Sequence, residues 1–188
     1  MRAIHLNMLG FRPPGGPKSE AEGAWMAQQG AGMDLLGAYF RVQASKTAVD
    51  RLAGRGNPVG QAAWIVERFY DWCDRREKPF EQSFTLDQLI TNVMIYVMTG
   101  SFTTGAWYYR ALLEGGAVPL AEGERCETPT SFANFPGEAL YKAPPRSYAE
   151  RAYNIVRWTD LPRGGHFAAM EEPDLFVDDV RAWARETG

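Results

Sequence analysis

The order of hydrophobic patterns along the chain constrains its fold more than any other feature. A short apolar run at residues 3–9 predicts a strand that begins almost at the first residue. Helical periodicity then dominates residues 19–113, and the last third contains strand patterns at 129–135 and 155–159 and a closing amphipathic helix at 173–184. Strands that alternate with helices favour an α/β fold, and the long helical stretch predicts an all-helical insertion.

Local capping signals predict where several of these helices begin. Asn57 followed by Pro58 combines a preferred N-cap residue with a preferred first helical residue. Thr85 has the side chain of an N-cap residue and predicts a second start. Ser19, followed three residues later by Glu22, has the pattern of a capping box and predicts a third.

Glycines interrupt this helical stretch. Gly30, Gly32 and Gly37 weaken the first helix, because glycine loses more conformational freedom on folding than other residues do. We therefore expect one or two breaks in that helix. A further short helix is expected at residues 46–52, ahead of a glycine turn at 54–56.

The composition excludes several classes of protein. The chain has 188 residues with 20 Lys+Arg and 23 Asp+Glu, so no basic surplus points to nucleic acid or to an anionic membrane surface. It contains no run of about eighteen apolar residues and no pattern of a signal peptide, and we expect a cytoplasmic protein without membrane attachment. Cys73 and Cys126 lie outside any CxxC pattern and are expected to be reduced thiols.

No cofactor or metal site is predicted, because no His, Cys or Asp cluster has ligand spacing and no glycine-rich phosphate loop occurs. The chain has only two histidines. His5 lies inside the first strand pattern and is interpreted as a structural residue. His166 follows two glycines just after a predicted strand, where the sites of α/β sheets lie, and it is a candidate general base.

Longer segments around these positions resemble one enzyme family. Residues 163–173 (RGGHFAAMEEP) look like the histidine loop of epoxide hydrolases of the α/β-hydrolase superfamily, in the branch of the microsomal and juvenile-hormone enzymes. Residues 4–8 (IHLNM) are similar to the strand just after that family's nucleophile helix. Residues 57–69 and 89–96 are similar to helices of its lid. The resemblance covers essentially the whole chain and identifies it with the C-terminal portion of such an enzyme.

The resemblance implies a partial α/β-hydrolase fold, made of the last three strands of the sheet with flanking helices, plus an all-helical lid. Residues 1–17 would hold the first core strand and its loop. Residues 18–120 would form the lid, and residues 121–188 would form the C-terminal part of the core.

Catalytic roles are also implied by the resemblance. In this family a carboxylate attacks the epoxide carbon to give an alkyl-enzyme ester, and a histidine–acid pair activates the water that hydrolyses it. His166 matches the general base. Glu138 matches the acid that orients it, in the acid-before-histidine order of α/β-hydrolases. The family pattern tolerates a bulkier residue where Gly137 stands.

Two tyrosines match the lid residues that donate hydrogen bonds to the epoxide oxygen in this family. Tyr39 falls where one of them belongs and Tyr109 where the other does, with the adjacent Tyr108 as an alternative. A neutral phenol, whose ordinary pKa is near ~10, can donate to a developing alkoxide without being ionised at neutral pH.

The family's nucleophile is an aspartate on a Gly-x-Asp-x-Gly turn, and no Gly-x-(Ser/Asp/Cys)-x-Gly sequence occurs in these residues. In the family that turn precedes the strand that residues 4–8 match. We therefore expect a truncated epoxide hydrolase that converts no substrate by itself, although its substrate class would be a small hydrophobic epoxide. The first strand should have an unpaired edge, which favours self-association or pairing with the missing N-terminal part.

Two other functions stay open. The chain could be a non-catalytic fragment that binds hydrophobic ligands or pairs with an N-terminal chain. Another α/β-hydrolase reaction, such as dehalogenation, is less favoured. Dehalogenases resemble this mechanism but stabilise the halide with other lid groups, often Trp or Asn, whereas a tyrosine pair suits an epoxide oxygen better.

Overall fold

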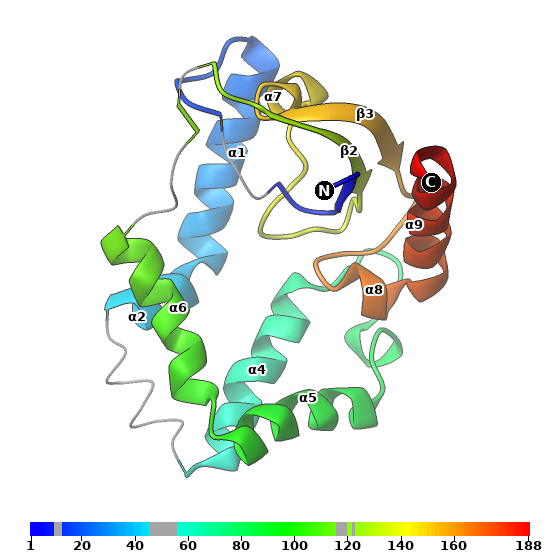
Figure 1. Ribbon diagram of the computed structural model, residues 1–188. Helices are drawn as coiled ribbons and strands as arrows, with labels where there is room; N and C mark the ends of the chain where they lie inside the picture. The colour runs from blue at the N-terminus through cyan, green and yellow to red at the C-terminus, as the bar shows by residue number, and fades with distance from the viewer. Residues whose placement is uncertain (10–12, 46–55, 116–119, 122) are drawn as a thin grey trace.

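The computed structural model describes residues 1–9, 13–45, 56–115, 120–121 and 123–188. Its strands are β1 (Ile4–Leu6), β2 (Cys126–Asn134) and β3 (Tyr153–Asp160). Its helices are α1 (Glu20–Leu36), α2 (Ala38–Ser45), α4 (Pro58–Trp72), the 3-10 helix η1 (Phe80–Gln82), α5 (Leu86–Thr99), α6 (Phe102–Gly115), α7 (Arg146–Glu150), α8 (Ala168–Glu171) and α9 (Pro173–Thr187). This arrangement of strands and helices, drawn in Figure 1, confirms the predicted α/β class.

The three strands form one parallel sheet in the order β1–β2–β3. β2 lies in the middle, and its residues 130–133 are all buried. A continuous buried run is typical of a parallel strand that is covered on both faces. β1 lies at the edge and pairs, among the described residues, only with β2, as the sequence predicts.

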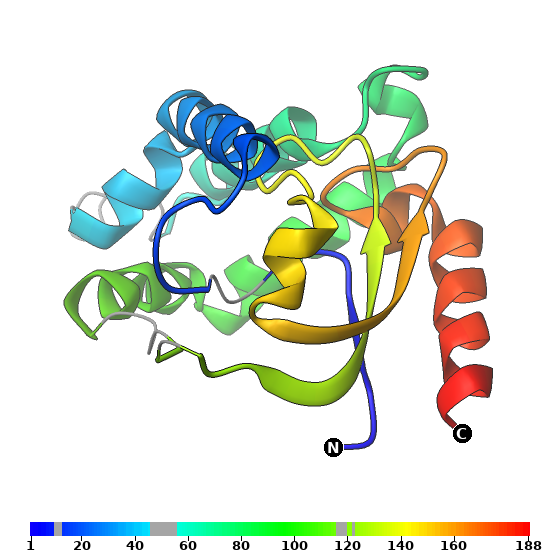
Figure 2. The same ribbon diagram turned by 90° about the horizontal axis from the view of Figure 1, so that it is seen from above.

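One face of the sheet is covered by α9, which Figure 2 shows running alongside the strands. His5 pairs with Ser131, which in turn pairs with Arg157, so these residues share a row across the sheet. Asp179 of α9 contacts both ends of the row. His5 Nε2 lies 2.8 Å from Asp179 Oδ2, and Arg157 donates to Asp179 Oδ1 at 2.9 Å. His5 therefore joins the sheet to α9, which agrees with its interpretation as a structural residue.

The opposite face carries the main apolar core. Phe132 of β2 packs there with Ala149 of α7, and Ile155 of β3 belongs to the same buried cluster. The ring of Phe132 stacks on Trp158, with 4.5 Å between ring centroids.

The remaining large helices lie together away from the sheet. Figure 1 shows α2, α4, α5 and α6 in this group, with α1 running between it and the strands. α2 packs against α6, and α4 packs against α5. No helix in the described ranges is long and apolar enough to cross a membrane.

Two of the three predicted helix starts have the expected caps. Asn57 Oδ1 accepts from Gly60 N at 2.9 Å, and Thr85 forms a complete capping box with Gln88. Of the capping box predicted at Ser19, only one of the two hydrogen bonds forms. Ser19 Oγ accepts from Glu22 N at 3.2 Å, but the Glu22 carboxylate does not return to Ser19 N. It accepts instead from Lys18 N at 2.7 Å and from Arg151 at 2.9 Å, because this charged pair is nearly buried.

The expected breaks in the first helix occur only in part. α1 continues without interruption through Gly30 and Gly32, and the chain breaks at Gly37, between α1 and α2. Tertiary contacts support α1, since Gln29 donates to Leu140 O and Trp25 donates to Lys142 O. These contacts outweigh the low helix propensity of the two glycines. The short helix expected at residues 46–52 lies outside the described residues.

Candidate active site

The loop after β3 carries His166 and is shaped by two glycines. Gly164 has φ +108°, a conformation that favours glycine. A Cβ atom at Gly165 would lie 2.7 Å from the backbone nitrogen of Asp74. His166 N donates to Trp72 O at 3.1 Å. The glycines therefore let this loop pass directly against the C-terminal end of α4.

Glu138 lies in the loop after β2, beside His166. Its Oε2 atom is 2.8 Å from His166 Nδ1, and its Oε1 atom accepts from Leu140 N at 2.8 Å and from Tyr141 N at 2.9 Å. Burial alone would raise the pKa of Glu138. The hydrogen bond to His166 and the two backbone donors outweigh burial and hold that pKa below its ordinary value of 4.5. Glu138 is therefore an ionised acceptor at neutral pH, and the Nδ1–H tautomer of His166 satisfies it.

This arrangement leaves Nε2 of His166 without a hydrogen-bond partner among the described residues. The ring contacts Trp72 and Phe167 edge to face, with centroids 5.0 and 5.1 Å away. An imidazole held in this way can take a proton from water at Nε2 while the carboxylate stabilises the imidazolium that forms.

Trp72 and Phe167 also line a cavity of about 430 Å³. Most of its wall is aromatic, with polar groups at a few positions. The aromatic residues of the wall are Tyr39, Trp64, Phe69, Trp72, Tyr96, Phe102, Tyr108, Tyr109 and Phe167. Such a cavity suits a small apolar ligand with one or two polar atoms.

Tyr39 and Tyr109 lie together in this wall. Their ring centroids are 5.6 Å apart in an edge-to-face arrangement. Tyr39 is buried, and burial together with its Tyr141 and Tyr109 neighbours raises its pKa far above the ordinary value of 10. Burial also raises the pKa of Tyr109. Both phenols therefore carry their protons at neutral pH. Tyr108 also lines the cavity, but it is 65% exposed.

The structure thus brings His166 and Glu138 into direct contact and places Tyr39 and Tyr109 in the adjoining cavity wall. The sequence did not single out Tyr141, which interacts electrostatically with both tyrosines and has its ring 6.3 Å from that of His166. Tyr141 follows Glu138 by three residues, and no spacing rule marks such a position.

Although the family pattern tolerates a bulkier residue at this position, Gly137 has no room for a side chain in this structure. A Cβ atom there would lie 2.5 Å from the Cβ of Asp74. Gly137 N donates to Gly164 O at 2.8 Å, so the backbones of the two loops are in contact beside Asp74. The approach of Asp74 from the end of α4 leaves no room for a side chain.

Both cysteines are free, as predicted from their spacing. Burial raises the pKa of Cys73 to about 11, so its thiol is protonated at neutral pH. In the described part of the chain, no group of three or more His, Cys, Asp or Glu residues is arranged to hold a metal ion.

The strand order, with an acid after β2 and a histidine after β3, defines part of an α/β-hydrolase fold. Solved structures agree with this class. Aspergillus niger epoxide hydrolase matches with a TM-score of 0.73 and 26% identity, over 100% of this chain and 46% of that one. Juvenile hormone epoxide hydrolase from the silkworm Bombyx mori matches in fold, with a TM-score of 0.79 and 22% identity over 100% of this chain and 49% of that one.

Sequence comparison identifies the relatives, although no protein-family model matches the chain. A putative epoxide hydrolase of Stigmatella aurantiaca is 32% identical over 190 aligned residues, which are 99% of this chain and 42% of that protein. Epoxide hydrolase 1 of Sus scrofa is 35% identical over 150 residues, which are 76% of this chain and 33% of that protein. The chain is a homologue of the epoxide hydrolases and matches their C-terminal portion. It spans about a third to two fifths of the length of these relatives.

Proposed function

We propose that this chain supplies the water-activating half of an epoxide hydrolase site, together with the cavity that holds the epoxide. The observation that carries the proposal is the 2.8 Å contact between His166 Nδ1 and Glu138 Oε2, beside a cavity lined by Tyr39 and Tyr109. In this proposal residues 18–120 act as the lid. Residues 1–17 and 121–188 act as part of the core.

The reaction proposed for the complete site has two steps. First, an aspartate carboxylate forms a bond to an epoxide carbon while the carbon–oxygen bond of the ring breaks. Tyr39 and Tyr109 donate hydrogen bonds to the oxygen that leaves. One of the phenols gives this alkoxide its proton, which forms the first hydroxyl group, and the phenol then recovers a proton from solvent. The raised pKa values of both phenols support this role, because each remains a donor at neutral pH.

Second, water hydrolyses the ester. His166 Nε2 takes a proton from the water as its oxygen attacks the ester carbonyl, and Glu138 stabilises the imidazolium. The ester carbon–oxygen bond then breaks, and the leaving oxygen takes the proton from the imidazolium of His166, so that a vicinal diol is released. The carboxylic acid loses its proton to solvent and becomes the carboxylate again. The aromatic wall of the cavity supports a small hydrophobic epoxide as the substrate class.

The 188 residues contain no Gly-x-Asp-x-Gly turn, so the first step has no nucleophile within this sequence. We therefore propose that the chain alone forms no ester and releases no diol. The test is to incubate the purified chain with a panel of apolar epoxides and to measure diol by mass spectrometry. Diol formation that His166→Ala abolishes would contradict this proposal and would require a different nucleophile.

A second candidate function is ligand binding without turnover. The observation that favours it is that residues of this chain, from α2, α4, α5, α6 and the histidine loop, already line the cavity. Calorimetry with an apolar epoxide tests it. Saturable heat with no diol, reduced by Tyr39→Phe, supports a binding fragment. Activity that appears only when the N-terminal portion of a relative is added supports the enzyme.

A further inference from the structure

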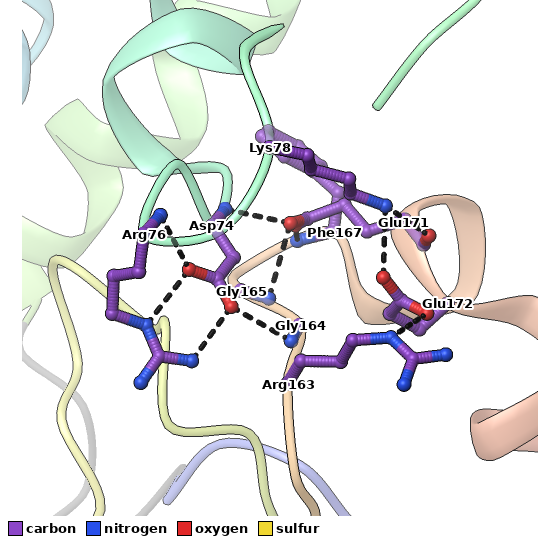
Figure 3. A network of polar contacts seen from close by, with 9 residues as sticks. All are labelled: Asp74, Arg76, Lys78, Arg163, Gly164, Gly165, Phe167, Glu171 and Glu172. Carbon is purple, nitrogen blue, oxygen red and sulfur yellow. Dashed lines mark hydrogen bonds and ion pairs between the residues drawn. The ribbon is translucent and has the colours of Figure 1, made fainter. Parts of the chain in front are cut away.

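Two buried carboxylates join the histidine loop to the segment after α4, and neither is assigned a role by the proposed reaction. Figure 3 shows Asp74 and Glu171 meeting the backbone of Gly164, Gly165 and Phe167. Both acids are 5% exposed. Both acids accept hydrogen bonds from backbone N–H groups next to His166 in the sequence or close to it.

Glu171 uses both carboxylate oxygens on the residues around His166. Its Oε2 atom accepts from Gly165 N at 3.1 Å and from Asp74 N at 2.7 Å, and its Oε1 atom accepts from Phe167 N at 2.9 Å. Gly165 and Phe167 are the two neighbours of His166 in the sequence. The carboxylate thus bridges across the histidine and also reaches the end of α4.

With the bond from His166 N to Trp72 O, every amide from Gly164 to Phe167 has a defined acceptor. Gly164 N donates to Asp74 Oδ2 at 2.9 Å, and the next three amides donate to Glu171, to Trp72 O and again to Glu171. A loop with all four donors occupied has little freedom to turn. The backbone of His166 is therefore fixed on both sides of its Cα atom.

A carboxylate fits the Glu171 position, because its two oxygens accept from three backbone N–H groups. An amide would direct its own NH₂ group at one of these donors, and a shorter acid would not reach all three. Burial, and to a lesser degree the charge of Asp74, raises the pKa of Glu171 above its ordinary value of 4.5, although the three backbone donors oppose that shift. The hydrogen bonds offset part of the cost of burying the carboxylate.

We propose that Glu171 is a positioning residue for His166: its carboxylate clamps the loop so that Nδ1 reaches Glu138 and Nε2 stays free. The importance of this clamp for catalysis rests on the proposed function, in which His166 is the base. The hydrogen bonds from Glu171 to the loop, and their effect on the His166 ring, can be measured without any enzymatic turnover.

The adjacent residue provides a matched control. Glu172 is also buried, but its carboxylate pairs with Lys78 at 2.8 Å and with Arg163 at 2.9 Å, both side chains. Glu171→Gln and Glu172→Gln therefore remove the same charge from neighbouring positions, but only the first removes the acceptor of the backbone amides on either side of His166.

The experiment is nuclear magnetic resonance of the ¹⁵N-labelled chain and of both variants. The ring nitrogens of His166 and His5 are the only imidazole signals, so His5 serves as an internal reference. In Glu171→Gln we expect amide exchange of Gly165 and Phe167 to become about tenfold to a hundredfold faster. We also expect loss of the His166 Nδ1–H signal that the bond to Glu138 protects. In Glu172→Gln we expect both observations to match the wild type.

An unchanged His166 ring signal in Glu171→Gln, or an equal change in Glu172→Gln, would overturn the proposal. If Glu171→Gln does not fold, Glu171→Asp keeps the charge but shortens the side chain, and the same loss at His166 with an unchanged His5 is expected. Failure of the proposed function would look different. The ring signals would respond as described, but no diol would form with any added N-terminal portion.

Discussion

His166 Nδ1 lies 2.8 Å from Glu138 Oε2, although 28 positions separate the two residues in the chain. They meet because β2 and β3 are neighbouring parallel strands, so the loops that leave their carboxyl ends start side by side. The contact therefore depends on the sheet register as much as on the two side chains.

Replacing Glu138 should destabilise the fold. Its carboxylate accepts from His166 and from two backbone nitrogens while it is buried, so Glu138→Gln should lower the free energy of unfolding by about 2 kcal/mol at neutral pH. Urea unfolding followed by tryptophan fluorescence measures this. Glu127→Gln is the control, because Glu127 is exposed and its carboxylate pairs, among the described residues, with Arg125 alone, and no measurable change is expected. Equal effects of the two variants would contradict the account of Glu138.

Acid should weaken the contact that Asp74 makes between the end of α4 and the histidine loop. Hydrogen bonds from Arg76, and also from Gly164 N, hold the pKa of Asp74 at about 2, below its ordinary 3.8. Because the pKa is lower in the folded state, ionised Asp74 stabilises the fold above about pH 4, and this contribution is lost as the pH falls towards about 2.

Asp74→Asn should remove that dependence. We expect the unfolding free energy of the variant to fall less steeply than that of the wild type below about pH 4, by on the order of 1 kcal/mol after allowance for the solvent around Arg76. Unfolding curves at several acidic pH values measure the difference. Parallel curves for the two proteins would show that Asp74 does not carry the effect.

Adding one methyl group at Gly137 should be costly. The new Cβ atom would overlap Asp74, and we expect Gly137→Ala to lower the free energy of unfolding by about 2 kcal/mol. Gly30 provides a contrast within α1, where nothing lies within 4 Å of a Cβ atom. Gly30→Ala should raise stability by roughly 0.5–1 kcal/mol, because alanine is the better helix former. Tolerance of alanine at Gly137 would mean that Asp74 does not approach it this closely.

The assignments of Tyr39 and Tyr109 as hydrogen-bond donors can be tested in an active mixture of this chain with the N-terminal portion of a relative. Tyr39→Phe removes one hydrogen-bond donor from the cavity and should slow ester formation about a hundredfold or more. Tyr108→Phe should have a much smaller effect, since that side chain is largely exposed, whereas Tyr109 lies against Tyr39. Single-turnover kinetics measure the rates. A large loss in Tyr108→Phe with none in Tyr109→Phe would exchange their assignments.

The parts of the fold that the sequence predicts best are those set by local chemistry. Asn57 and Thr85 begin their helices as expected, because each cap depends on residues three positions away. The strand expected at residues 129–135 begins earlier, at Cys126. The expected first residue, Pro129, lies inside β2, next to an irregularity in the pairing with β3, where a missing backbone donor is tolerated.

The parts that the sequence does not predict depend on distant partners. Glu22 turns away from the Ser19 cap because Arg151 lies beside it in the fold, 129 positions along the chain. Glu171 stands inside the segment that resembles the family's histidine loop, but its role depends on Asp74, 97 positions away. No periodicity or motif connects such residues. The contact between the end of α4 and the histidine loop can therefore be recognised only once the three-dimensional structure is known.

The most direct test of the central claim is to restore the nucleophile. The chain is mixed or co-expressed with the N-terminal portion of the Stigmatella aurantiaca relative, up to the point where the two sequences begin to match, and diol formation from an apolar epoxide is measured. We expect no diol from the chain alone, diol from the mixture, and none from a mixture that carries His166→Ala. Diol from the chain alone, or a His166→Ala mixture as active as the wild type, would contradict the proposal that this chain provides the water-activating half of the site.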